Sequence, residues 1–367
     1  MKILHVGKFY PPHMGGIETH LQDLCCALRT SIDLQVIVSS DDRRTFEETV
    51  NGVAVSRLGT WFSLASTPCC PGMVRKIRNS AADIVHLHLP NPMAVIAYLL
   101  SGHRGRLIIS YHSDTVRHRL LSALFNPILH EALRRSSAII ASSKAYQDTS
   151  PVLSCYTDKC HIIPFGISLE NFERCDDVAR KEVRRRFGDR LIVSVGRLVS
   201  YKGFEYLLQA MTRVRGSLVI VGDGPLRAKL QQLARELGVH NRVYFVGTIP
   251  QSITAYYHAA DVFALASTAR SEAFGIVQIE AMAAGLPVVN TRLDSGVPFV
   301  SVHDHTGITV PPADPDALAA ALNRLLDNRD LSKSFGDAGR QRAREEFALE
   351  KMTATTLDLY ERVAHQA

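Results

Sequence analysis

The chain has 367 residues, of which 46% are hydrophobic and 21% are charged, and its formal net charge is +6. This length favours two domains over one, and the composition excludes an intrinsically disordered protein. The charge is uneven, because residues 1–168 contain 17 Lys and Arg against 12 Asp and Glu. That basic excess suits an anionic substrate or an anionic membrane surface.

Short apolar runs alternate with amphipathic helical patterns along the first half of the chain. This alternation is typical of parallel strands that are joined by helices covering the sheet. We expect strands at Ile3–Val6, Leu34–Val38, Ile84–Leu87, Leu107–Ser110, Ala138–Ala141 and His161–Ile163, with helices at Ile17–Leu28, Met93–Leu100 and Leu120–Arg135.

The alternation begins again after residue 168. We therefore predict an α/β protein with two doubly wound Rossmann-like domains, 1–167 and 168–349, that face an interdomain cleft, because ligands bind beyond the carboxyl ends of parallel strands. A last helical pattern over 350–367 leaves open a return to the first domain. The strands expected in the second domain are Leu191–Val195, Leu218–Val221, Val243–Val246, Val262–Leu265, Val288–Asn290 and Ile308–Val310.

The cysteines and the hydropathy bear on the compartment. The seven cysteines form no CxxC pair, which favours reduced thiols. The first residues lead directly into a strand, and no apolar run reaches the roughly 18 residues of a membrane span. We expect a cytoplasmic chain, with peripheral contact at the inner face of the plasma membrane left open.

Two carboxylates stand eight residues apart in Glu272-Ala-Phe-Gly-Ile-Val-Gln-Ile-Glu280. Gly275 opens an apolar periodicity typical of a helix. If the residues between the carboxylates are helical, the two groups lie about 12 Å apart along the axis, which is the reach of a nucleotide-sugar from hexose to ribose. Amides at the helix start would then face the diphosphate. A dipole partner and a solvated surface glutamate are the alternative.

Basic residues follow the strand at Leu191–Val195. The segment Gly-Arg-Leu-Val-Ser-Tyr-Lys-Gly places Arg197 and Lys202 in the loop after that strand. A guanidinium and an ammonium at the carboxyl edge of a sheet suit an anionic leaving group. A solvated pair before a helix is the alternative.

Two glycine-containing loops also follow strands. Gly222 and Gly224 in Val-Gly-Asp-Gly-Pro permit close approach of a ligand, and an ordinary turn explains them equally well. Gly15 and Gly16 precede the first expected helix, where backbone amides can meet a phosphate.

Two histidine and aspartate patterns have residue types that can bind a metal ion. His86 and His88 alternate on one strand and share a face, but a metal would need a third ligand that the sequence does not identify. Asp314-Pro-Asp316 matches an Asp-x-Asp motif formally, yet its position before a helix favours capping. His112 ends another strand and is a candidate site residue.

Together these motifs resemble the retaining, GT-B-fold glycosyltransferases of family 4, and the resemblance covers essentially the whole chain. It implies that Glu272 contacts donor-sugar hydroxyls, that Glu280 binds the ribose, and that His112 faces the donor sugar. It also implies that Arg197 and Lys202 bind the diphosphate. The remaining positions that the resemblance assigns to donor binding are Gly15, Gly16, Gly222, Gly224, Phe274, Gly275, Ile276 and Val277.

The resemblance favours a bacterial mannosyltransferase of surface polysaccharide assembly. It implies a GDP-mannose donor, a glycan or lipid-diphosphate-linked acceptor, retention of configuration, and no cofactor, metal or nucleic acid. Phe299 departs from the family pattern, because an acid is common at that position. Three alternatives stay open: a UDP-sugar-dependent transferase with a soluble acceptor, a sugar-nucleotide epimerase of the same fold, and a non-catalytic sugar-nucleotide-binding assembly protein.

Overall fold

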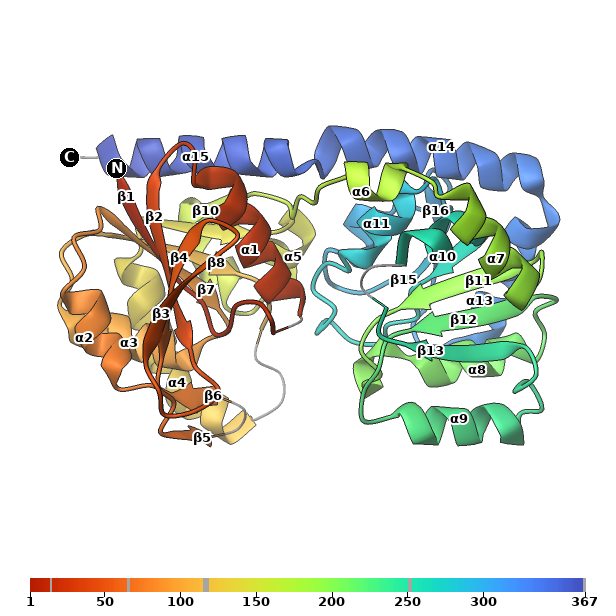
Figure 1. Ribbon diagram of the computed structural model, residues 1–367, viewed down its shortest axis with the longest axis horizontal. Helices are drawn as coiled ribbons and strands as arrows, with labels where there is room; N and C mark the ends of the chain where they lie inside the picture. The colour runs from red at the N-terminus through yellow and green to blue at the C-terminus, as the bar shows by residue number, and fades with distance from the viewer. Residues whose placement is uncertain (14, 65–66, 115–118, 250–252, 366–367) are drawn as a thin grey trace. The chain divides into compact units, whose positions relative to one another are not determined.

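The computed structural model describes the chain except for residues 14, 65–66, 115–118, 250–252 and 366–367. The chain divides into two compact units (Figure 1). Unit 1 comprises Met1–Gly166 and Leu349–Ala367, and unit 2 comprises Ile167–Ala348. Each unit has its own parallel sheet and its own core, which is the predicted α/β architecture.

Unit 1 contains an eight-stranded sheet in the order β10-β9-β8-β7-β1-β2-β4-β3. All neighbours are parallel except β3 and β4. Successive strands β7 to β10 run outward on one side of β1, and β2, β4 and β3 lie on the other, as in a doubly wound fold. The strands are β1 (Lys2–Val6), β2 (Asp33–Ser39), β3 (Phe46–Val50), β4 (Val53–Leu58), β7 (Ile84–Leu89), β8 (Arg106–Tyr111), β9 (Ala138–Ala141) and β10 (Cys160–Ile162), with a separate hairpin of β5 (Phe62–Leu64) and β6 (Thr67–Cys69).

The helices of unit 1 cover both faces of this sheet. Ile3 and Ile84 point to one face, where they pack with Leu24 of α1 and Leu359 of α15 in one hydrophobic cluster. The C-terminal helix α15 thus belongs to the core of unit 1 and packs on α1. The helices are α1 (Gly16–Leu28), α2 (Gly72–Arg78), α3 (Pro92–Ser101), α4 (Arg119–Arg135), α5 (Lys144–Thr149), the 3-10 helix η1 (Leu153–Lys159) and α15 (Leu349–His365).

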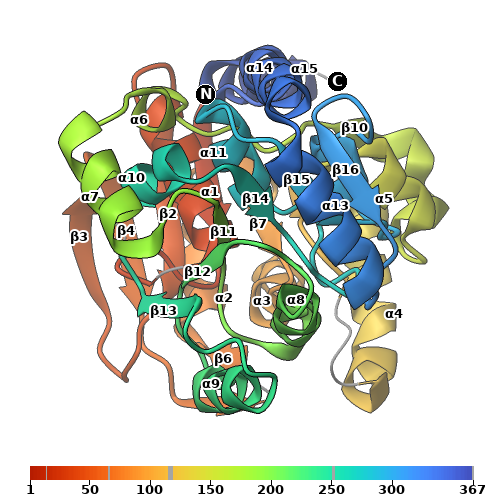
Figure 2. The same cartoon turned by 90° about the vertical axis from the view of Figure 1, so that its right-hand side faces the viewer.

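Unit 2 contains a six-stranded, wholly parallel sheet in the order β13-β12-β11-β14-β15-β16, which can be followed in Figure 2. The central strand β11 has β12 on one side and β14 on the other, so the direction of winding changes there. The strands are β11 (Leu191–Val195), β12 (Ser217–Val221), β13 (Val243–Gly247), β14 (Val262–Ala264), β15 (Val288–Thr291) and β16 (Gly307–Val310).

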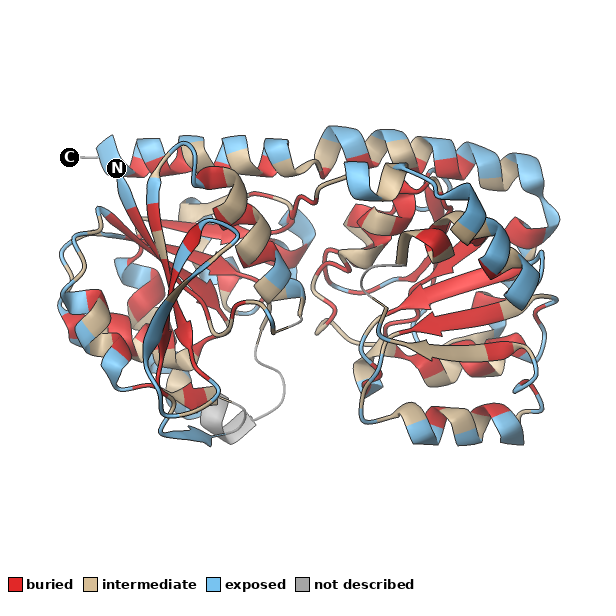
Figure 3. Cartoon of the chain, in the orientation of Figure 1, coloured by how far each residue is buried: buried red, intermediate tan, exposed pale blue. Residues whose placement is uncertain are grey.

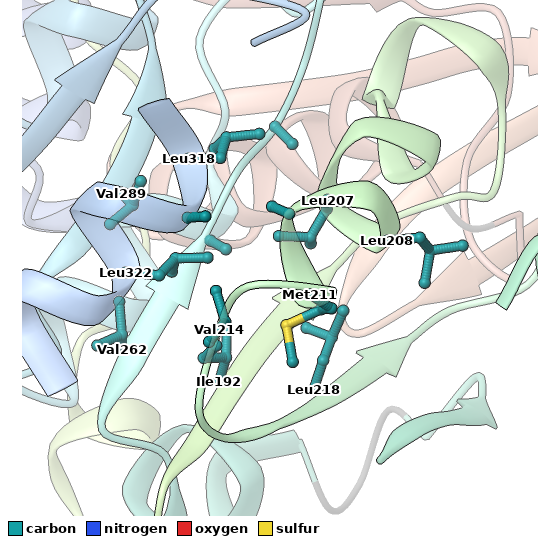
Figure 4. Close-up of a cluster of buried hydrophobic side chains, with 14 of the residues drawn as sticks. Ile192, Leu207, Leu208, Met211, Val214, Leu218, Val262, Val289, Leu318 and Leu322 are labelled. Atoms are coloured by element: carbon teal, nitrogen blue, oxygen red, sulfur yellow. The ribbon is translucent and has the colours of Figure 1, made fainter. Parts of the chain in front are cut away.

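The core of unit 2 lies between its sheet and the helices α8, α9 and α13. Ile192 and Val262 from the sheet meet Leu207 and Met211 of α8 and Leu322 of α13 (Figure 4). Most strands of this sheet are buried along almost their whole length, whereas the edge strand β13 is mostly of intermediate burial, as Figure 3 shows. The helices are α6 (Glu170–Glu173), α7 (Asp177–Phe187), the 3-10 helix η2 (Ser200–Lys202), α8 (Phe204–Met211), α9 (Arg227–Glu236), α10 (Ile253–Ala259), α11 (Val277–Ala283), α12 (Val297–Val300), α13 (Pro315–Asp327) and α14 (Arg329–Glu346).

Two further expectations can be compared with the structure. Asp314 caps α13, since its side chain accepts hydrogen bonds from the amides of Asp316 and Ala317, as the capping interpretation predicted. Among the described residues, no helix combines the length and apolar character that crossing a membrane requires.

Candidate active site

Three loops meet at the carboxyl edge of the unit 2 sheet, after β11, β12 and β14. Their backbones approach so closely that glycine is required. A Cβ atom on Gly222 would lie 2.1 Å from the carbonyl oxygen of Gly196, and one on Gly203 would lie 2.0 Å from the carbonyl oxygen of Ala266. Gly203 and Gly222 also have φ values of 65° and 135°, which side chains disfavour. The glycines therefore fix the loops that carry the polar groups described below.

Lys202 and Glu272 form a buried ion pair across two of these loops. The Nζ atom of Lys202 lies 2.5 Å from Oε2 of Glu272, and the two side chains are only 11% and 10% exposed. Ser267 donates a second hydrogen bond to the same oxygen, at 2.9 Å. Burial alone would lower the pKa of Lys202, but the Glu272 carboxylate, together with Tyr201 and Glu280, outweighs burial and raises this pKa above its ordinary value. Lys202 is therefore a cation at neutral pH.

The other oxygen of Glu272 is left for a ligand. Among the described residues, Oε1 of Glu272 has no hydrogen-bond partner, and it is not sealed in the interior. Lys202 has three donors, of which the ion pair uses one. The pair can thus present an acceptor and donors at one place.

A helix starts between Glu272 and Glu280, as predicted, but the residues between the two carboxylates are not all helical. Helix α11 begins only at Val277, and Glu272 lies in the turns before it. Gly275 interrupts the helical path because its φ is 72°. The estimate of about 12 Å along a helix axis therefore does not apply to this pair.

Glu280 lies on α11 and is fixed by a tyrosine of α10. The hydroxyl of Tyr257 donates a hydrogen bond of 2.6 Å to Oε2 of Glu280. Tyr257 is fully buried, and burial together with this carboxylate raises its pKa well above the ordinary value. The Tyr257 hydroxyl therefore stays protonated and keeps Glu280 oriented. Glu280 also acts electrostatically on Lys202, which places it near the ion pair.

Arg197 differs from Lys202 in its surroundings. It follows β11 directly, and its side chain is exposed. Among the described residues it forms no salt bridge, so its guanidinium is free to bind an anion. The same loop is tied to its neighbour by the Leu198 amide, which donates to the Asp223 carbonyl at 2.9 Å, and a Cβ atom on Gly224 would meet the Leu198 carbonyl oxygen at 2.6 Å.

The residues that precede α11 include a buried aromatic side chain and backbone amides that are available to a ligand. Phe274 is buried and packs near Phe299 and Phe347. Phe299 thus completes an aromatic cluster at the position where the family pattern has an acid. Among the described groups, the amides of Gly275 and Ile276 have no hydrogen-bond partner.

Unit 1 carries the glycine loop and the predicted histidine. Gly15 is the N-cap of α1 with extended backbone, and Gly16 begins that helix. Glu18 lies in the first turn, and its carboxylate would be 2.2 Å from a Cβ atom on Gly15. His112 follows β8 and is buried, and its Nε2 lies 3.1 Å from Nδ1 of His88. Burial lowers the pKa of His112 well below its ordinary value.

The third histidine that the sequence left unidentified comes from β1. His5, His86 and His88 each place one ring nitrogen within 4.8 Å of the others, as do His20, His88 and His112. All five are buried.

Sequence reasoning missed several of these groups. Ser267 and Tyr257 stand outside every motif. Ser267 lies five residues before Glu272 in the same loop after β14, and the packing of α10 brings Tyr257 to Glu280. His5 had a usable signal, because it alternates with the apolar residues of a buried strand and so had to point to one face of the sheet.

Comparisons with known proteins agree with this fold. Residues 14–171 match the family model described as Glycosyltransferase Family 4, and residues 176–342 match the one described as Glycosyl transferases group 1. The chain is similar to the O-antigen chain mannosyltransferase C of Escherichia coli, with 31% identity over 98% of each chain. It is also similar to a GDP-mannose-dependent α-(1-6)-phosphatidylinositol monomannoside mannosyltransferase of Mycolicibacterium smegmatis, with 30% identity over 92% of each chain.

A solved structure extends the likeness to the fold. The crystal structure of Anabaena Alr3699/HepE in complex with UDP superposes with a TM-score of 0.82 at 22% identity, covering 99% of this chain and 100% of that one. At this identity the likeness concerns the fold alone.

Proposed function

This chain belongs to the GT-B-fold glycosyltransferases of family 4, and on that premise we propose that it transfers a mannosyl group from GDP-mannose. The proposed acceptor group is a hydroxyl of a glycan or of a lipid-diphosphate-linked acceptor. The proposed transfer retains the anomeric configuration and uses no metal ion. The names of two relatives, both mannosyltransferases and one GDP-mannose-dependent, support this donor. The observation that carries the proposal is the buried Lys202–Glu272 pair at the carboxyl edge of the unit 2 sheet.

Unit 2 binds the donor in this account. Arg197 and Lys202 bind the diphosphate, with backbone support from Gly275, Ile276 and Val277. The free Oε1 of Glu272 accepts hydrogen bonds from hydroxyls of the sugar. Glu280, held by Tyr257, accepts hydrogen bonds from the ribose. In unit 1, Gly15 and Gly16 approach the phosphates and His112 contacts the donor sugar.

Catalysis is electrostatic. The bond between the anomeric carbon and the diphosphate oxygen breaks, and a bond to the acceptor oxygen forms on the same face of the sugar. The acceptor proton passes to the departing phosphate oxygen. Negative charge grows on the diphosphate as it leaves, so the cations Arg197 and Lys202 stabilise the transition state more than the ground state. Two cations supply the charge that a divalent metal would supply elsewhere, which is the basis for proposing metal independence.

The proposal also covers the compartment of the chain and its contact with a membrane. We place the chain in the cytoplasm, with its basic N-terminal half suited to a peripheral contact with an anionic membrane, where a lipid-linked acceptor would reside.

A donor panel tests this function. Thermal unfolding is followed with GDP, GDP-mannose, UDP and UDP-glucose, since a ligand that binds only the folded chain raises its apparent stability. We expect GDP and GDP-mannose to stabilise the chain more than the uridine compounds do, with or without EDTA. A larger effect of UDP would overturn the donor assignment. Formation of an epimer without any acceptor would indicate an epimerase, and binding without turnover in the presence of acceptors would indicate an assembly protein.

A further inference from the structure

Five buried histidines gather on one face of the unit 1 sheet and on the helix that covers it. His5 on β1 pairs in register with His86 on β7, and His88 follows two residues later on the same face. His112 comes just after β8, and α1 contributes His20 above them. The pleat that directs Ile3 and Ile84 into the core therefore also directs the strand histidines there.

Three of these rings form a hydrogen-bonded chain. Nε2 of His112 lies 3.1 Å from Nδ1 of His88, and Nε2 of His88 lies 3.1 Å from Nδ1 of His5. The rings of His88 and His112 are stacked at 5.4 Å with 17° between their planes. The chain ends in the core, because Nε2 of His5 has no hydrogen-bond partner among the described residues.

His86 forms a separate branch. Its Nδ1 lies 2.6 Å from the Tyr360 hydroxyl, and its Nε2 lies 2.8 Å from the Ser110 hydroxyl. Both nitrogens are therefore satisfied by hydroxyl groups, and His86 is not needed for the chain that reaches His112.

The number of protons on the rings limits the directions that the hydrogen bonds between His5, His88 and His112 can take. Burial lowers the pKa of His5 to about 3 and lowers those of His88 and His112 well below the ordinary value, so each ring is neutral and carries one proton. Two arrangements satisfy both N···N contacts. If His112 donates to His88, the His5 Nε2 proton is buried without an acceptor. If His5 donates instead, His5 Nε2 is a bare acceptor and the His112 proton lies on Nδ1.

The second arrangement is favoured, because buried N–H groups without an acceptor are rarer in proteins than under-used acceptors. We propose that His5 and His88 are positioning residues that hold His112 in its Nδ1–H tautomer and thereby present a fixed N–H donor to a hydroxyl oxygen of the donor sugar. The last step rests on the proposed function, in which His112 contacts that sugar. The tautomer itself does not depend on it.

The first test reads the tautomer directly. Protein labelled with ¹⁵N-histidine is studied by long-range ¹H–¹⁵N correlation at neutral pH, with His112→Gln used to assign the His112 signals. We expect the proton of His112 on Nδ1 in the wild-type chain. His88→Leu should shift His112 toward the Nε2–H form, which predominates for a histidine side chain in water. His86→Leu is the matched control. It removes a neighbouring buried histidine that takes no part in the hydrogen bonds between His5, His88 and His112, so it should leave the His112 tautomer unchanged.

The second test reads catalysis. His88→Leu should lower kcat/KM for GDP-mannose about tenfold, as expected for one misdirected hydrogen bond. His88→Asn retains an amide donor near the position of Nδ1 and should recover most of this loss, which a merely structural role would not predict. If His88→Leu fails to fold, the wild-type spectrum and the Asn variant still decide the matter.

The outcomes separate the two ideas. A wild-type His112 protonated on Nε2 would overturn the positioning role whatever the activity. The expected tautomers without any turnover of GDP-mannose would contradict the proposed function and leave the positioning role standing. One equivalent of zinc retained by the purified chain and lost in His88→Leu would show that these rings bind a metal, and would overturn the hydrogen-bonded chain.

Discussion

Lys202 and Glu272 are joined by a 2.5 Å ion pair, although seventy residues separate them in the chain. They meet because β11 and β14 are neighbours in the sheet, so the loops that follow them share one edge. The pair is almost fully buried, which makes it costly to break and sensitive to its partners.

Removing one partner of this pair should destabilise the chain. Glu272→Leu leaves the Lys202 ammonium buried without its counterion, and we expect the free energy of unfolding to fall by about 3 kcal/mol in urea. The double variant Lys202→Met/Glu272→Leu should lose less than the sum of the two single variants, because it removes both charges. Additive losses would show that the two groups do not interact in solution.

Tyr257 should matter for nucleotide binding without touching the nucleotide. Tyr257→Phe removes the hydrogen bond that orients Glu280, so we expect the Kd for GDP measured by calorimetry to rise roughly fivefold. Tyr256→Phe is the matched control, since Tyr256 packs near Phe187. Equal Kd values for the wild type and Tyr257→Phe would contradict the role given to Glu280.

The close approach of the β11 and β12 loops predicts a cost for any side chain at Gly222. Gly222→Ala should lower the free energy of unfolding by more than about 2 kcal/mol, because a Cβ atom there would meet the Gly196 carbonyl oxygen at 2.1 Å. Gly238 also has a positive φ, of 69° against 135° at Gly222, and a Cβ atom there would meet no atom within 4 Å, so Gly238→Ala should cost only about 1 kcal/mol. Similar losses in both variants would rule out the steric contact.

The buried histidines predict a loss of stability in acid. Burial lowers the folded-state pKa of His20 from 6.5 to about 3, so between these values the unfolded chain binds a proton that the folded chain does not. The resulting stability is complete above pH 6.5 and is lost as the pH falls toward 3. His20→Phe should reduce the slope of unfolding free energy against pH in this window by about 1.4 kcal/mol per pH unit. His240→Phe replaces an exposed histidine of unit 2 and serves as the control; an unchanged slope in His20→Phe would contradict the prediction.

The buried parallel strands could be predicted from the sequence because they are continuous apolar runs. β9 and β11 have the predicted bounds, Ala138–Ala141 and Leu191–Val195. β3 was missed, since Phe46–Val50 is a mostly exposed and polar edge strand. Its turn, Asn51-Gly52, has positive φ at both residues and was the available signal for a hairpin.

The sequence predicted which types of residue belong to the candidate site, but it did not predict which of their side chains contact one another. The periodicity from Gly275 correctly predicted a helix that starts between the two carboxylates, but it carried no information about the left-handed backbone of Gly275, which keeps Glu272 outside that helix. The pairing of Lys202 with Glu272 depends on the strand order, and periodicity within either segment carries no information about it.

The central claim is retaining mannosyl transfer from GDP-mannose. The most direct measurement incubates the chain with GDP-mannose and a lipid-diphosphate-linked glycan acceptor and determines the anomeric configuration of the product by NMR. We predict an α-mannosyl linkage, the configuration of the donor, with turnover lowered at least a hundredfold in Lys202→Ala, on the scale of losing one group that stabilises charge in the transition state. A β-linked product, or transfer only from a UDP-sugar, would contradict this account.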